Sequence, residues 1–228
     1  MCGRYTQTAK LDELIERFGF KNPGVDLAPR YNLAPNQDAP VVGVRQDTPD
    51  VRSLRLMRWG LVPFWAKAST AGTTMINARA ETLRQRPAFK HLVAGNRCLI
   101  LADGFYEWFG DGRTRTPVLF QLRNRDPFAF AGLWDRWRQP DGTLLYSFTI
   151  ITTEPNELVR QIHNRMPAIL LPEDEKGWLD PTVRDPDAVS RMLGPYPAGL
   201  MQSHCVSRAV NSPFNDFPEC IVPEARND

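Results

Sequence analysis

The chain has 228 residues, of which 42% are hydrophobic, and a formal net charge of +2. Its 12 phenylalanines and 6 tryptophans supply enough apolar surface for a packed core, which excludes a disordered chain. The apolar runs are much shorter than the roughly 20 residues of a membrane-spanning helix, and no signal pattern opens the sequence, so we expect a cytoplasmic protein without membrane contact.

The first predicted element is an amphipathic helix in TAKLDELIERFGF. Its apolar residues recur at i, i+3, i+4 and i+7: Leu11, Leu14, Ile15 and Phe18. Thr8 is the expected cap and Gly19 the expected stop. The next stretch, NPGVDLAPRYNLAPNQDAP, predicts an ordered loop without regular structure. VVGVRQ and VRSLRLMRW then predict two strands joined by a turn at DTPD, and RPAFKHLVAG predicts a short helix with Pro87 in its first turn.

From Arg97 to Thr153 the strand patterns follow one another in series. They are RCLILAD, GFYEWF, TPVLFQLR, PFAFAGLWDRW and LLYSFTIIT, with turn residues at GDGR, NRDP and QPDG. Next, EPNELVRQI predicts a helix, MPAILL a buried strand, EDEKGWL and DAVSRML two short helices, and HCVSRAV a last strand. The series predicts an α+β fold, a single domain over residues 1–228 around a mostly antiparallel sheet that is closed or nearly closed.

The charge is uneven along the chain. Between Arg52 and Arg97 nine basic residues (Arg52, Arg55, Arg58, Lys67, Arg79, Arg84, Arg86, Lys90 and Arg97) accompany one acid, Glu81. The same segment holds the aromatic residues Trp59, Phe64, Trp65 and Phe89. Cations with interleaved aromatic faces suit a groove for single-stranded nucleic acid. The alternative is a solvated cationic face over core aromatics.

The four cysteines, Cys2, Cys98, Cys205 and Cys220, form no CxxC pair, and the three histidines have no ligand spacing with them. We therefore expect no disulfide framework, no metal and no other cofactor.

Cys2 is the exception in chemistry, because removal of Met1 would leave an α-amine and a thiol on one residue. The amine can condense with an aldehyde, and the thiol can close on the imine as a thiazolidine. Alternatively, the thiol can attack an acyl group with the amine as base. A third hypothesis is that the position of Cys2 has no functional meaning.

Three further stretches carry candidate chemistry. In ADGFYEWFG, strand alternation places Glu107 among aromatic residues, which predicts a raised pKa suited to proton transfer, unless Glu107 pairs with an arginine at a solvated sheet edge. His163 follows a predicted helix, whose end favours the protonated imidazole of a general acid; a structural histidine is the alternative.

In NARAET, strand alternation would project Asn77 and Arg79 to one side. This arrangement suits contacts to a sugar and its phosphate, and a plain surface strand is the alternative. Arg165 in HNRMP can be interpreted in the same way.

Seven separated motifs occur in a recognisable order: MCGRYT, RYNLAP, WGLVPFWA, INARAET, ADGFYEW, IHNRMPAIL and VSRAVNSP. Together they resemble the SRAP domain family, the abasic site processing proteins, also called SOS response-associated peptidases. The resemblance runs over residues 2–223 as the core and leaves a tail at 224–228. It implies a β-rich α+β domain with an antiparallel pseudo-barrel and peripheral helices.

The resemblance also implies a function in the DNA damage response. The protein would bind abasic sites in single-stranded DNA, at replication forks or single-strand to double-strand junctions, and would crosslink to them as a thiazolidine. Lyase-type cleavage at the abasic site and autoproteolysis are further implied activities. Such a protein would act as a monomer in the cytoplasm, at the nucleoid in a bacterium.

Residue roles carry over by position. The catalytic centre implied by the resemblance comprises Cys2, Asn77, Glu107 and His163. The implied DNA-binding surface comprises Arg4, Trp65, Arg79, Thr152, Arg165, Ser207 and Arg208, with Asn211 nearby.

Two other classes of function stay open at this point. N-terminal nucleophile hydrolases and class II amidotransferases also begin with MCG, although apolar strand residues follow there and RYTQT follows here. The second class is a non-catalytic single-stranded nucleic-acid-binding protein that uses the segment from Arg52 to Arg97.

Overall fold

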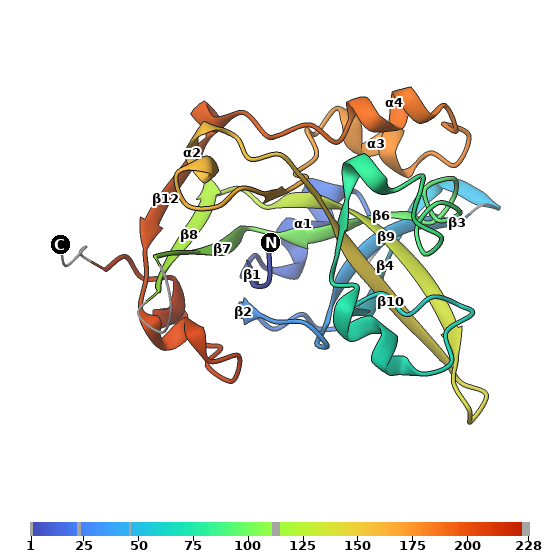
Figure 1. The fold of residues 1–228 in the computed structure, drawn as a ribbon, viewed down its shortest axis with the longest axis horizontal. Coiled ribbons are helices and arrows are strands. Elements are labelled where there is room, and N and C mark those ends of the chain that lie inside the picture. The colour runs from blue at the N-terminus through green and yellow to red at the C-terminus, as the bar shows by residue number, and fades with distance from the viewer. Residues whose placement is uncertain (1, 22–23, 46, 111–114, 225–228) are drawn as a thin grey trace.

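The computed structural model describes residues 2–21, 24–45, 47–110 and 115–224, and its strands form two sheets (Figure 1). The strands are β1 (Tyr5–Gln7), β2 (Arg30–Leu33), β3 (Asp38–Arg45), β4 (Thr48–Trp59), β5 (Asn77–Arg79), β6 (Arg97–Ala102), β7 (Gly104–Phe109), β8 (Thr116–Leu122), β9 (Phe128–Arg138), β10 (Leu144–Thr153), β11 (Met166–Pro167) and β12 (Met201–Cys205). The α-helices are α1 (Leu11–Phe18), α2 (Glu157–Arg160), α3 (Asp174–Leu179) and α4 (Pro186–Arg191). Short 3₁₀ turns complete the chain: η1 (Ser69–Thr74), η2 (Ala80–Thr82), η4 (Ala198–Leu200), η5 (Arg208–Asn211) and η6 (Pro218–Ile221).

One sheet closes on itself. Its strands follow the order β10-β4-β3-β6-β9, and β9 pairs back with β10 over a long register from Leu144↔Arg138 to Ile150↔Gly132. The β10–β4 pairing is short and parallel, whereas the other contacts around the ring are antiparallel. The predicted mostly antiparallel pseudo-barrel in an α+β fold is therefore confirmed.

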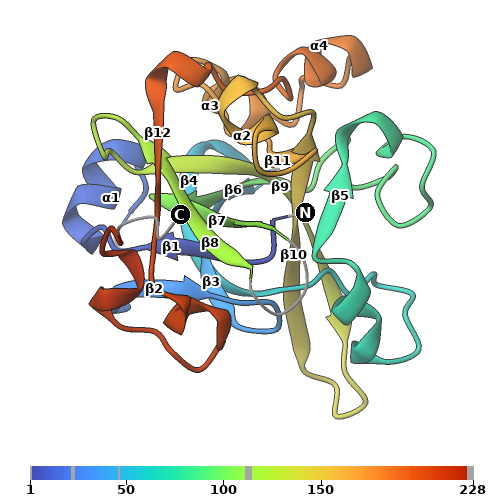
Figure 2. The same cartoon turned by 60° about the vertical axis from the view of Figure 1, so that its left-hand side comes forward.

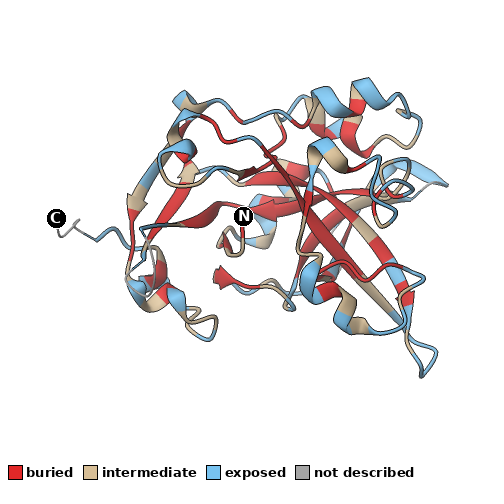
Figure 3. Cartoon of the chain, in the orientation of Figure 1, coloured by how far each residue is buried: buried red, intermediate tan, exposed pale blue. Residues whose placement is uncertain are grey.

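The second sheet, in the order β12-β8-β7-β1-β2, covers one end of this barrel. The Tyr5 ring of β1 makes edge contacts with Trp59 and Phe130 of the barrel at centroid distances of 5.1 and 5.6 Å. Phe105 of β7 meets Phe130 at 6.3 Å. The buried segments thus run from the barrel into the covering sheet as one core (Figure 3).

The helices lie on the outside of the sheets (Figure 2). In α1, Leu14 and Phe18 are buried, and Gly19 ends the helix with a φ of 64° and an N–H donated to the Ile15 carbonyl, as the sequence predicts. The predicted cap was wrong: Lys10 occupies that position. The Thr8 hydroxyl instead donates to Asp103 at 2.7 Å.

The Pro- and Asn-rich stretch is not all loop, because residues 30–33 form β2. Leu33 pairs with Tyr5 and is buried, so a neighbouring strand supplies the partner that local composition does not reveal. Strand β4 begins at Thr48, so most of DTPD belongs to the strand and not to a turn.

Two other elements differ from their predictions. Residues 86–95 form successive turns in which Phe89 and Lys90 both donate to the Arg86 carbonyl, and not a helix. In HCVSRAV the strand ends at Cys205, because the Ser207 side chain caps η5. Residue 46, residues 111–113 of the GDGR turn and residues 225–228 of the tail lie outside the described residues. Within the described part of the chain, no helix is both long and apolar enough to span a membrane.

Candidate functional site

Cys2 lies at the junction between the barrel and the covering sheet. Its side chain is fully buried within the main core, and its Sγ is 3.7 Å from the Arg4 carbonyl oxygen. Asn77 Nδ2 donates a hydrogen bond of 2.8 Å to the Cys2 carbonyl. Burial, together with the negative charge of Glu107, raises the pKa of the Cys2 thiol far above its usual range. The thiol is therefore held in its protonated form.

Glu107 is the buried carboxylate of the site. It lies on β7 opposite Val118, and only 3% of its surface is exposed. Phe105 belongs to the main core and Tyr106 to a separate cluster on the opposite face, as the predicted alternation requires. Burial raises the pKa of Glu107 to about 7. The predicted raised pKa thus has the predicted cause, an apolar environment.

His163 follows α2 and lies beside Glu107. Its Nδ1 is 3.9 Å from Glu107 Oε1 and 3.1 Å from the backbone nitrogen of Arg165. Burial lowers the pKa of His163, which is opposite to the expected stabilisation of the imidazolium by a helix end. Because α2 has only four residues, its dipole is small, and desolvation decides the direction.

Pairing with β10 explains why these distant residues meet. β5 runs parallel to β10 and places Asn77 beside Ile150, while β11 pairs with the end of β10 and fixes the chain just after His163. On the other side, β1 pairs with β7, which sets Cys2 near Glu107. The four residues of the predicted catalytic centre therefore come together from four separate segments.

Arg165 is engaged within the protein. Its Nη1 and Nη2 contact the two carboxylate oxygens of Glu81 at 2.5 and 3.0 Å, and Nη2 also donates to the backbone carbonyl of the buried Thr152 at 2.6 Å. The Arg165 guanidinium lowers the pKa of Glu81. Glu81 therefore occupies the hydrogen-bonding edge that a phosphate would need.

Arg4 also has partners within the chain. Its Nη1 donates to Asn32 Oδ1 at 3.0 Å and to the Val210 carbonyl at 2.8 Å, and Nη2 donates to the Asn211 carbonyl at 3.3 Å. Burial lowers the pKa of Arg4. This guanidinium joins β1 to the segment that contains η5.

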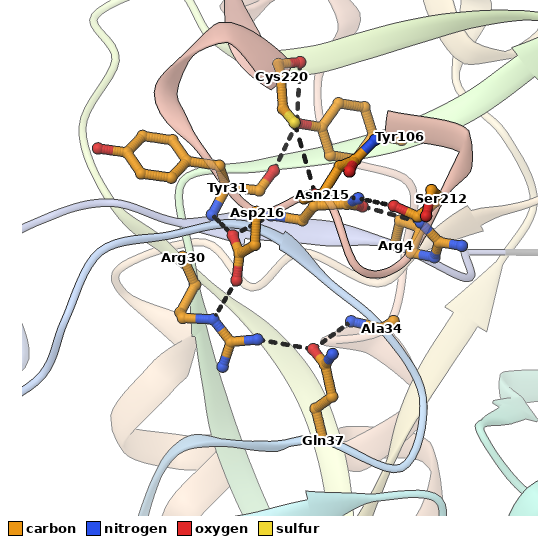
Figure 4. Close-up of polar contacts among 11 residues, drawn as sticks. Arg4, Arg30, Tyr31, Ala34, Gln37, Tyr106, Ser212, Asn215, Asp216 and Cys220 are labelled. Carbon is orange, nitrogen blue, oxygen red and sulfur yellow. Dashed lines mark hydrogen bonds and ion pairs between the residues drawn. The ribbon is translucent and has the colours of Figure 1, made fainter. Parts of the chain in front are cut away.

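The residues that hold this segment were missed by the sequence reasoning. Asp216 accepts hydrogen bonds from the backbone nitrogens of Tyr31 and Asn32 at 2.5 and 3.0 Å, and pairs with Arg30 at 2.5 Å (Figure 4). The Asn32 amide donates to the carbonyls of Val210, Ser212 and Asn215. Arg30, Tyr31 and Asn32 belong to the RYNLAP motif, so the sequence does indicate this part of the network. Their partner Asp216 lies far along the chain, and no local pattern connects the two.

The other predicted DNA-binding residues lie at three places along the chain: after β4, on β5 and at η5. Trp65 follows β4 and is 54% exposed, next to Phe64 at 59%. Arg79 is exposed on β5, and the exposed Arg208 follows Ser207, whose hydroxyl accepts from the Ala209 nitrogen. A surface pocket of about 450 Å³ opens beside His163, lined by Glu154, Pro155, Arg160, Ile162, His163 and Asn164.

The cysteines and histidines supply no evident cofactor site. In the described residues no three His, Cys, Asp or Glu side chains gather as metal ligands. All four cysteines are buried free thiols, and burial raises the pKa of Cys98 as it does that of Cys2. Among them, Cys2 alone lies near Glu107 in the described contacts.

The profile of the SOS response associated peptidase (SRAP) family matches residues 1–213. The chain belongs to this family.

The relatives match most of this chain, and the bacterial ones match over nearly their whole length. The abasic site processing protein YoqW of Bacillus subtilis is 46% identical over 97% of this chain and 99% of its own. The abasic site processing protein HMCES of Gallus gallus is 36% identical over 86% of this chain and 66% of its own. A crystal structure of a protein from Bacteroides thetaiotaomicron superimposes with a TM-score of 0.87 at 26% identity, covering 98% of this chain and all of that one.

Proposed function

We propose that this protein binds abasic sites in single-stranded DNA and captures them covalently through the N-terminal residue Cys2 after removal of Met1. The observation that carries the proposal is the buried pair of Cys2 and Glu107, a nucleophile beside a carboxylate whose pKa is raised to about 7. Membership of the SRAP family and the names of the relatives support abasic DNA as the substrate.

The chemistry follows from the two groups on Cys2. The α-amine adds to the ring-opened aldehyde of the abasic sugar, and loss of water gives an imine. The Cys2 sulfur then bonds to the imine carbon, while the thiol proton passes to the nitrogen, which closes a thiazolidine. The net reaction joins aldehyde and protein with release of one water.

Glu107 suits both proton transfers. With a pKa of about 7 it is populated in both protonation states near neutral pH, so it donates a proton to the departing hydroxyl and accepts the thiol proton. This matters because the buried thiol forms little thiolate by itself.

The neighbouring side chains position the reactants. Asn77 holds the Cys2 carbonyl and thereby orients the amine. His163, 3.9 Å from Glu107, would exchange a proton with the sugar O4′ during ring opening or in reversal of the crosslink. Lyase-type cleavage at the abasic site and autoproteolysis of the leading residue would use the same groups.

The DNA would lie across the seam as a single strand or a junction. Arg79 and Arg208 are exposed and would contact phosphates, and Trp65 would stack on a base. Arg165 would reach a phosphate only by giving up Glu81, so in the free protein it holds the chain after His163 in place. We propose a monomer that acts in the cytoplasm, at the nucleoid if the protein is bacterial.

Intact mass spectrometry under denaturing conditions tests the proposal. The wild type, with loss of Met1 verified, is mixed with single-stranded DNA that contains one abasic site. We expect a species equal to protein plus DNA minus one water, absent in Cys2→Ala and retained in Cys205→Ser, which removes a different buried thiol. Wild type without this adduct would refute covalent capture. Glutamine hydrolysis that needs Cys2 but no DNA would instead support an amidotransferase.

A further inference from the structure

The barrel has a second, uncovered end that the proposed chemistry does not use. A pocket of about 360 Å³ opens there, and the residues that matter for its chemistry are Arg45, Arg55, Met57, Trp134, Arg136 and Tyr146. Tyr146 and Thr152, at the two ends of the inner part of β10, are six residues apart, about 20 Å along an extended strand. This pocket, called the barrel mouth below, is therefore separate from the seam that holds Cys2.

Register shows that the mouth side chains continue the inward-facing rows of the barrel. Arg55 is opposite Val41, which lies in the main core, and Arg136 is opposite Tyr146, one inward position beyond the buried Phe148. An inward row that ends in arginine and not in an apolar residue leaves the last layer of the barrel polar and accessible. Barrel mouths with such mixed linings are frequent ligand sites.

The floor of the mouth is aromatic. The rings of Trp134 and Tyr146 lie 6.1 Å apart at an interplanar angle of 31°. The Arg55 guanidinium covers the Tyr146 ring at 4.0 Å, which is a cation–π contact. Both rings are only partly buried, so they offer flat surface beside a fixed positive charge.

The cations of the mouth are not equally free. Arg45 is paired with Asp47 at 2.8 Å, and both side chains are mostly exposed. Arg55 and Arg136 have no carboxylate within ion-pair distance among the residues that the structure describes. The mouth therefore combines two unneutralised guanidiniums with an aromatic floor.

We propose that the barrel mouth is a second binding site, which takes one nucleotide unit: a base against Trp134 and Tyr146, and its phosphate between Arg55 and Arg136. An acidic peptide would use the cations but not the aromatic floor, and an apolar ligand would leave two arginines desolvated without partners. A nucleotide uses both features. The preferred source of this nucleotide is the DNA strand that flanks the abasic site, and this choice rests on the proposed function.

Binding by fluorescence anisotropy tests the mouth with two kinds of probe. The first is unmodified single-stranded DNA in a length series from about 4 to about 30 nucleotides, chosen to begin within the usual site size of one binding module and to exceed it. The second is free dAMP, followed by chemical-shift mapping. The variants are R55Q/R136Q and, as a matched control, the double charge change R191Q/R184Q on exposed arginines away from the mouth.

We expect R55Q/R136Q to bind the long strands about tenfold more weakly than wild type, with the log–log salt slope reduced by about 0.7 for the one lost phosphate contact. The control should lose less than twofold, and the shortest DNA should not distinguish the variants. Shifts at Trp134 and Tyr146 with dAMP, without a length effect, would identify free nucleotide as the source. No response to dAMP and equal long-strand affinity of both double variants would overturn the proposal.

The covalent adduct separates this proposal from the function above. R55Q/R136Q should form the Cys2 adduct with a short abasic oligonucleotide at the wild-type rate. If that adduct fails in the wild type, covalent capture is wrong while the mouth is still testable with unmodified DNA.

Discussion

The two ends of the barrel differ in residue type and in exposure to solvent. At the covered end, the second sheet removes water from Cys2 and Glu107, and burial moves both pKa values upward. At the open end, the side chains of Arg55 and Arg136 are exposed to solvent. Desolvation therefore raises the pKa of the buried groups at one end, whereas charged side chains stay exposed at the other. The covering sheet makes the difference.

The largest expected effect is on the covered end. Glu107→Gln keeps the shape but cannot transfer protons, so the rate of adduct formation should fall about 10²- to 10⁴-fold. The wild-type rate should depend on pH, with an inflection near the Glu107 pKa of about 7. The variant should lack this inflection. Time courses quenched at intervals and analysed by intact mass spectrometry from pH 5 to 9 give both the rate and its pH dependence. An unchanged inflection in Glu107→Gln would assign it to another group.

Glu107→Gln should lower the rate of adduct formation but raise the stability of the fold at alkaline pH. The folded pKa of Glu107 is about 7 against an ordinary 4.5, so the folded state holds the proton more tightly. Wild-type stability is therefore full below pH 4.5 and falls as the pH rises to 7, by an amount on the order of 3 kcal/mol. Glu107→Gln loses no proton and should be more stable than wild type at pH 8. Urea unfolding at pH 4.5 and pH 8 measures this; an equal gain at both values would contradict it.

Arg4 offers a stability test that does not depend on catalysis. Arg4→Leu removes three hydrogen bonds to Asn32 and to the η5 segment, and should lower the unfolding free energy by about 1–3 kcal/mol. The exposed Arg191→Leu is the control. Faster hydrogen exchange around Val210 in Arg4→Leu would locate the loss at the segment, whereas unchanged exchange would place the role of Arg4 elsewhere.

A smaller effect is expected at the pair of Arg165 and Glu81. Glu81→Gln should free the guanidinium for a phosphate and increase affinity for single-stranded DNA a few-fold, with a salt slope steeper by about 0.7. Glu16→Gln, an exposed acid on α1, controls for net charge. Anisotropy at several salt concentrations measures both. Weaker binding by Glu81→Gln would mean that the pair itself is needed to shape the site.

The sequence predicted the strands of residues 97–153 well because their alternation and turn residues are local signals. It missed β2, whose strand character depends on pairing with β1, and it predicted a helix at residues 86–95 where turns occur. The raised pKa of Glu107 was predicted from neighbouring aromatics. The direction for His163 was wrong, because tertiary burial outweighs the dipole of a four-residue helix.

Contacts between residues far apart in the chain could not be predicted from the sequence. Glu81 and Arg165 are 84 positions apart, and no local pattern connects them. The basic and aromatic segment from Arg52 to Arg97 suits one nucleic-acid groove or a solvated cationic face, but the fold divides it. Arg55 lies at the barrel mouth, whereas Arg79 pairs with Thr152 of β10.

The burial of the Cys2 thiol has a consequence for its durability. Oxidants and electrophiles react with thiolates, and a thiol that is protonated and shielded from solvent reacts slowly with them. We therefore expect Cys2 to outlast exposed thiols in a cell under oxidative stress, when damaged DNA accumulates. The burial that slows reaction of the sulfur with oxidants and other electrophiles should therefore also keep the thiol intact for an aldehyde bound beside it.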